Sequence, residues 1–176
     1  MPVIIPRPPK TMLEVYNSLP EGTLCQLINN NLVMSPSPLD IHQVILMEIF
    51  FQLQAHLKQN KAGVLRIAPY DVHFSKRNIL QPDIIFIANN NLDKIEKTGF
   101  KGAPDIVIEI LSPSTSHFDM EEKKSIYEQF EIKEYYIVEP NSKNVYTNII
   151  QNREYKELDM GTRKINSRLL NTIIEF

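Results

Sequence analysis

APDIVIEILSPST at residues 103–115 and QPDIIFIANN at residues 81–90 are two apolar runs that each follow the dipeptide Pro-Asp. Short, nearly continuous runs of Ile and Val are typical of β-strands that are covered on both faces. Side chains alternate along a strand, so Asp105, Val107 and Glu109 are expected on one face of the second run. The sequence therefore predicts a carboxylate, Glu109, inside the core, where burial costs several kcal/mol unless a partner is present.

Two interpretations of Glu109 are open from its own position. It could form a structural salt bridge or occupy an edge position that faces water. Alternatively, it could belong to a site for a hard cation, because Mg²⁺ prefers a few carboxylate oxygens and completes its shell with water and phosphate oxygens. Asp83, at the start of the first run, could supply the second carboxylate. Asp105 competes with Asp83 for this role, and it could equally cap the start of its strand.

A lysine in the predicted helix over residues 119–130 points toward the second interpretation. Met120, Lys123, Tyr127 and Phe130 follow at spacings of 3, 4 and 3, so they share one helical face. Lys123 lies within this apolar stripe, and Lys124 lies toward its edge. The Lys123 ammonium could extend into water, or it could face the acids and hold a phosphate or an attacking water. Two acids and a lysine are typical of phosphodiester-cleaving sites.

The rest of the chain predicts one α/β or α+β domain whose central sheet is flanked by helices. A short helix is expected within residues 10–22, and two strands at 23–28 and 32–38 around an asparagine turn. A long amphipathic helix should begin with Asp40 as its N-cap. Residues 63–75 alternate as one strand, 134–140 form another, and 144–176 form a closing meander. We divide the chain into an arm with a short helix, residues 1–19, and a single domain, residues 20–176.

Composition limits the possible partners and compartment. The chain has 176 residues, of which 43% are hydrophobic, and a formal net charge of −2, so no overall basic field indicates nucleic acid or membrane binding. The single cysteine, Cys25, excludes an internal disulfide and fits a reducing environment. Neither a signal peptide nor a membrane-spanning run is evident. We expect a cytoplasmic protein with no membrane association.

Several motifs, taken in order, resemble a bacterial "putative restriction endonuclease" family (Uma-type) of the PD-(D/E)XK nuclease superfamily. They are QPDIIFI, APDIVIEILSPST, the Asp119-to-Tyr127 segment with its EKK, and EYYIVEP. LVMSPSPLDIHQ also resembles the family's Ser-Pro turn, and His42 matches its histidine. The similarity runs from about residue 20 to the C-terminus. It implies a restriction-endonuclease-like core with a mixed central sheet, and DNA as the substrate.

The resemblance also implies roles for individual residues. Asp83 matches the motif aspartate and Glu109 the motif glutamate, and together they would hold Mg²⁺ or Mn²⁺. The usual lysine position, two residues after the glutamate, is Leu111 here. The lysine is then relocated to the following helix, where Lys123 stands. Gln26 occupies a position at which the family usually has a glutamate, so one negative charge is lost.

Two functions follow from these observations. The first is a metal-dependent endonuclease that hydrolyses phosphodiester bonds in DNA, with Asp83, Glu109 and Lys123 as its catalytic residues. The alternative is a nuclease-fold module that binds nucleic acid or assembles with partners after its catalysis has decayed. Gln26 favours the module, whereas the intact Asp83, Glu109 and Lys123 favour the enzyme. A homodimer is also expected, because superfamily members often pair and the tail strands offer an edge that needs cover.

Overall fold

The core of the protein is a mixed β-sheet. The computed structural model describes residues 8–112, 118–158 and 160–176, and in these residues the sheet has seven strands in the order β12-β11-β10-β9-β6-β3, with β13 beside β11. Strands β9 and β10 are parallel, and the other neighbours are antiparallel. The sheet confirms the expected mixed α+β class. Its strands are β3 (Gly63–Ile67), β6 (Ile84–Ala88), β9 (Ile106–Ile110), β10 (Glu134–Val138), β11 (Asn144–Gln151), β12 (Glu154–Glu157) and β13 (Gly161–Thr162).

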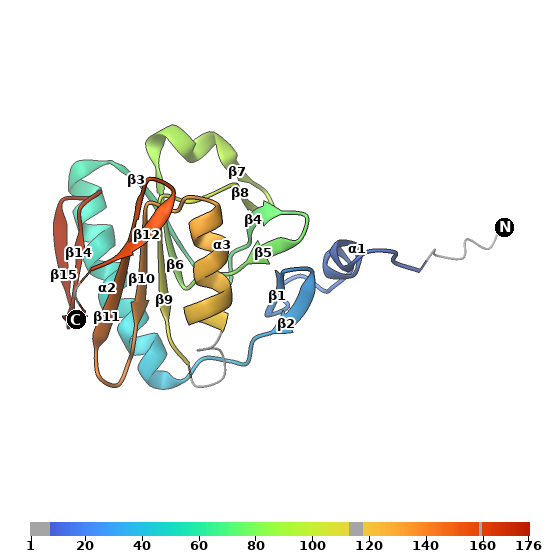
Figure 1. Cartoon of the computed structure of the whole chain (residues 1–176), viewed down its shortest axis with the longest axis horizontal. Helices are drawn as coiled ribbons and strands as arrows, with labels where there is room; N and C mark the ends of the chain where they lie inside the picture. Colours follow the sequence, from blue (N-terminus) through green and yellow to red (C-terminus); the bar gives the residue numbers. More distant parts are fainter. Residues whose placement is uncertain (1–7, 113–117, 159) are drawn as a thin grey trace.

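Helices cover the two faces of this sheet (Figure 1). The long helix α2 (Asp40–Asn60) packs on the face that carries Ile84 and Phe86. The short helix α3 (Lys124–Gln129), which continues from a π-helical turn (Phe118–Lys123), packs on the face that carries Ile85 and Ile87. Coverage on both sides explains why the strands read as continuous apolar runs.

The start of helix α2 differs from the sequence prediction. Asp40 is the first helical residue, and Leu39 occupies the cap position without a side-chain capping bond. The prediction of Asp40 as the N-cap was therefore wrong by one residue. Its negative charge still lies in the first turn, where it interacts favourably with the helix dipole.

A second sheet lies beside the central one and carries the N-terminal hairpin. The hairpin turn contains Asn29 and Asn30, both with positive φ, which confirms the predicted asparagine turn. The short helix α1 (Met12–Asn17) is also confirmed, and residues 1–7 of the expected arm lie outside the described residues. The sheet has the order β2-β1-β5-β4-β8-β7: β1 (Cys25–Ile28), β2 (Asn31–Met34), β4 (Val72–Ser75), β5 (Asn78–Leu80), β7 (Ile95–Glu96) and β8 (Gly99–Lys101).

Residues 63–75 do not form the single strand that their alternation predicts. They form β3 of the central sheet and β4 of the second sheet, with a cis Ala68–Pro69 peptide between them. Pro69 has no N–H to donate, so it cannot continue a ladder of backbone hydrogen bonds. The chain therefore crosses from one sheet to the other at this point. A 3₁₀ helix, η1 (Asn89–Lys94), later leads from β6 back to the second sheet.

The C-terminal strands divide between two places. Strands β11 and β12 continue the central sheet as the expected meander, whereas β14 (Lys164–Ser167) and β15 (Thr172–Glu175) pair separately as a hairpin beside α2. The buried Glu134 attaches this hairpin to the sheet, because its carboxylate accepts hydrogen bonds from the Ser167 hydroxyl at 2.7 Å and the Leu169 N–H at 2.7 Å.

Strand β12 lies at one edge of the central sheet. Its exposed residues include Glu154, Lys156 and Glu157, and charges at an edge disfavour pairing with another chain. These charges do not support pairing at this edge, and the homodimer stays a prediction. Among the helices of the described residues, none is both long and apolar enough to cross a membrane.

Candidate active site

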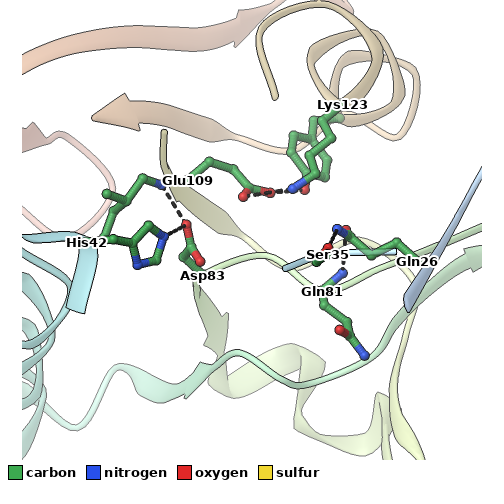
Figure 2. A network of polar contacts seen from close by, with 9 residues as sticks. Gln26, Ser35, His42, Gln81, Asp83, Glu109 and Lys123 are labelled. Atoms are coloured by element: carbon green, nitrogen blue, oxygen red, sulfur yellow. Dashed lines mark hydrogen bonds and ion pairs between the residues drawn. The ribbon is translucent and has the colours of Figure 1, made fainter. Parts of the chain in front are cut away.

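A cleft of about 620 Å³ opens at the end of the central sheet, next to the second sheet and the start of α2. Asp83 precedes β6, Glu109 belongs to β9, and Lys123 ends the π-helical turn before α3. All three line this cleft, together with His42 of α2 and Gln26 of β1. Figure 2 shows these side chains gathered around the cleft from separate parts of the fold. The three residues that the sequence singled out are thus brought together.

Strand pairing explains why Asp83 lies beside Glu109. Strands β6 and β9 are antiparallel, and Ile84 pairs with Ile108. One step further in the same register places Asp83 opposite Glu109, where cross-strand side chains are about 5 Å apart at Cβ. The Ile110 N–H also donates a hydrogen bond of 2.7 Å to Asp83 Oδ2. That the two carboxylates share one metal ion stays a prediction.

Glu109 accepts hydrogen bonds from two side chains of the helical segment. Lys123 Nζ lies 2.9 Å from its Oε2, and the Tyr127 hydroxyl lies 2.6 Å from its Oε1. Glu109 and Lys123 are 2% and 4% exposed, so the ammonium does not extend into solvent. A buried ion pair of this kind is tolerated because each charge has a charged partner and the carboxylate accepts a further hydrogen bond from Tyr127.

The helix geometry places Lys123 and Tyr127 on the same face. They are four residues apart, and such residues are neighbours on a helix surface. Lys124 projects elsewhere and pairs with Glu157 of β12. The sequence identified this face but treated Tyr127 only as an apolar member of it, so the role of its hydroxyl was missed. The side chain of Met120, the first member of the stripe, lies outside the described residues.

His42 contacts the other acid. It is buried in the first turn of α2, and its Nε2 lies 3.1 Å from Asp83 Oδ2. This contact favours a role for His42 in orienting the Asp83 carboxylate. Together with the Ile110 N–H, His42 fixes the position of the Asp83 carboxylate just before the start of β6.

Gln26 forms part of the cleft wall. Its Nε2 donates to the Ser35 hydroxyl at 3.2 Å, and its Oε1 accepts from the Gln81 N–H at 2.9 Å (Figure 2). The side chain is buried, and it connects β1 to the segments that precede α2 and β6. The amide can make both of these bonds at once because it has both donors and an acceptor. Gln26 is therefore held in the cleft wall by two structural hydrogen bonds.

Asp105 is held far from this cleft, at the opposite end of β9. Four residue steps along the strand lie between it and Glu109, which corresponds to about 13 Å. Its carboxylate accepts hydrogen bonds from Lys133 Nζ at 2.6 Å, the Ala88 N–H at 2.8 Å and Asn91 Nδ2 at 3.0 Å. Burial raises the pKa of Asp105, but these three bonds outweigh it and the pKa is lowered overall. Asp105 therefore stabilises the junction of β6 and β9.

The lowered pKa predicts how Asp105 contributes to stability. When the folded-state pKa lies below the unfolded value, about 3.9 for Asp, the stabilisation is complete above that value and is lost as pH falls through the folded pKa. Asp105→Asn should therefore lower the free energy of unfolding by about 2 kcal/mol at pH 7. The difference from the native chain should shrink below about pH 4. Urea unfolding at several pH values measures it, and a difference that does not change with pH would contradict the assignment.

The donor set at the cleft fits a hard divalent cation with few protein ligands. Within the described residues, no group of three or more His, Cys, Asp and Glu side chains is arranged to hold a metal. The cleft therefore offers two carboxylates, Asp83 and Glu109, rather than a closed cage. Mg²⁺ is commonly bound by one or two carboxylates and completes its shell with water and phosphate oxygens.

Comparison with known proteins agrees with this architecture. The family model Uma2, described as "Putative restriction endonuclease", matches residues 13–173. Among solved structures, the fold is similar to that of a "putative nuclease belonging to DUF820" from Anabaena variabilis ATCC 29413, with a TM-score of 0.75. The two chains are 20% identical, and the match covers 93% of this chain and 92% of the other. No curated protein matches the chain.

Proposed function

The chain belongs to the Uma2 family, described as "Putative restriction endonuclease", and on this premise we propose that it is a metal-dependent endonuclease that hydrolyses phosphodiester bonds in DNA. Asp83 and Glu109 would hold Mg²⁺ or Mn²⁺, and Lys123 would assist. One observation carries the proposal: two carboxylates from adjacent strands and a buried lysine from a helical segment line the same cleft.

The position of Lys123 supports a catalytic role. A lysine with an exposed fraction of 4% is costly to bury, even beside the carboxylate of Glu109. It is also in contact with the cleft, so its ammonium can reach a bound phosphate. Donors that are fixed before the reaction stabilise charge that develops in the transition state. Lys123 would donate to a phosphate oxygen or hold the attacking water.

The other residues would position these groups. Tyr127 fixes Glu109 through its hydroxyl, and His42 and the Ile110 N–H fix Asp83. A divalent cation, when bound by the two acids, supplies charge neutralisation at the phosphate and lowers the pKa of water. These contacts matter because removing a group that orients a metal ligand typically lowers the metal affinity of the site by about 10- to 100-fold.

Two measurements on the native protein test the proposal. Mn²⁺ should raise the melting temperature, since a ligand that binds only the folded state stabilises it, by about 2.7 kcal/mol at 100 times its Kd. Labelled DNA should be cut internally with Mg²⁺ or Mn²⁺ and stay intact with EDTA. Cleavage that persists in EDTA, or no cleavage of any DNA form, would reject the endonuclease.

The alternative is a module that has kept the nuclease fold without catalysis. Gln26 favours it, because the amide replaces an acid of the family and already bonds with Ser35 and the Gln81 N–H. The melting experiment separates the two functions. A decayed site would show no stabilisation by Mn²⁺, whereas the endonuclease requires it.

A further inference from the structure

The walls of the cleft are mostly apolar. The segment before α2 contributes Pro36, Pro38 and Leu39, and α2 contributes Met47. Ile67 at the end of β3 and Pro69 in the crossing that follows also line the cleft. Leu39 and Met47 are 56% and 38% exposed, so apolar surface faces the entrance. Exposed apolar surface beside a few convergent polar groups is typical of a pocket that binds one small organic group.

The charges in the cleft are few. Lys123 is the one lysine or arginine among the described lining residues, and it is accompanied by Asp83, Glu109 and His42. A bound divalent cation would neutralise the two carboxylates, so the net charge of the cleft would be the single positive charge of Lys123. That charge matches one phosphodiester. A duplex instead presents one negative charge per about 1.7 Å of its axis, and proteins that bind it typically neutralise several phosphates.

We propose that the cleft takes an unpaired nucleotide of single-stranded DNA, with its base against the apolar wall and its phosphate at the acids and Lys123. This inference rests on the proposed endonuclease function and names the form of its substrate. The volume of about 620 Å³ is within the range of about 300–1,000 Å³ typical of small-ligand clefts. A paired nucleotide has to leave its stack to enter such a pocket, which costs a few kcal/mol, and an unpaired nucleotide avoids most of that cost.

Binding of labelled oligonucleotides tests the inference separately from cleavage. Fluorescence anisotropy with Ca²⁺ in place of Mg²⁺ would compare a thymidine single strand, a blunt duplex and a duplex with a central gap. The single strand and the gapped duplex should bind at least about tenfold more tightly than the blunt duplex, as an unstacking cost of more than 1.4 kcal/mol implies. The plot of log K against log salt should have a slope between about −0.7 and −1.4, as for one or two single-strand phosphates.

A matched pair of variants on α2 locates the binding surface. Met47→Gln replaces an apolar side chain that lines the cleft. Phe51 lies one turn further along α2, is 61% exposed and does not line the cleft, so Phe51→Gln is the control. Met47→Gln should weaken single-strand binding by about fivefold, in line with the apolar area lost, and Phe51→Gln should leave it unchanged. Both positions are exposed, so both variants should fold.

The outcomes separate the inference from the proposed function. Equal or tighter binding of the blunt duplex, or single-strand binding that Met47→Gln does not weaken, would overturn the inference even if the protein cleaves DNA. If single-strand binding depends on Met47 but no metal-dependent cleavage occurs, the endonuclease is rejected. The inference that the cleft binds an unpaired nucleotide is then supported. A protein that binds and cleaves the single strand preferentially would support both.

Discussion

Lys123→Met should lower the rate of DNA cleavage by about 10²- to 10³-fold, the loss typical of removing one preorganised donor from a site where charge develops. Methionine keeps the approximate length and the apolar character of the side chain, so the change removes mainly the ammonium. The Lys123 Nζ bond of 2.9 Å to Glu109 is lost, and the Tyr127 hydroxyl still donates to the same carboxylate. Single-turnover cleavage with saturating Mg²⁺ measures the chemical step.

Lys124→Met is the control for this prediction. Lys124 is the next residue along the helix, displaced by about 100°, and it pairs with the exposed Glu157. Removing such a surface ion pair changes stability by about 0–1 kcal/mol and should leave cleavage unchanged. Equal rates in the two variants would reject Lys123 as the catalytic lysine. Circular dichroism should show that both variants fold, because loss of activity through unfolding would otherwise resemble loss of catalysis.

Much of this site could be predicted because its signals are local in sequence. The strands β6 and β9 follow from apolar runs, and the burial of Glu109 follows from side-chain alternation. The face that carries Lys123 follows from helical spacing. Each of these patterns needs only a few neighbouring residues. The assignment of Asp83, Glu109 and Lys123 to one site came from the family resemblance, and for Lys123 the helical spacing indicated the same residue.

The features that sequence reasoning missed depend on contacts between distant segments. The split of residues 63–75 into β3 and β4 depends on which sheet accepts each strand. The role of Tyr127 depends on where its hydroxyl meets Glu109. The two Pro-Asp motifs look alike in sequence, but β6 and β9 run antiparallel, so the strand starts lie at opposite ends of the sheet. Asp83 therefore reaches the cleft, whereas Asp105 reaches Ala88 and Asn91.

This contrast gives the second large prediction, a comparison of Asp83→Asn with Asp105→Asn. Asp83→Asn should abolish the Mn²⁺-induced rise in melting temperature, because the amide replaces one of two anionic ligands. It should also lower the cleavage rate by more than about 10²-fold, because losing a ligand weakens the site more than losing a residue that orients a ligand. Without metal its stability should change little, since the amide oxygen still accepts from the Ile110 N–H. Differential scanning fluorimetry with and without Mn²⁺ measures both effects.

Asp105→Asn should give the opposite pattern. It weakens the bonds to Lys133 and the Ala88 N–H and so lowers the melting temperature without metal. Its Mn²⁺-induced rise should equal that of the native chain, because Asp105 is about 13 Å along the strand from Glu109. If Asp105→Asn lost the response to Mn²⁺ and Asp83→Asn kept it, the metal would bind at the Asp105 end of the sheet, and the assignment of Asp83 would be wrong. The predicted result means that one Pro-Asp motif supplies a metal ligand, and the other supplies the buried anion that joins β6 to β9.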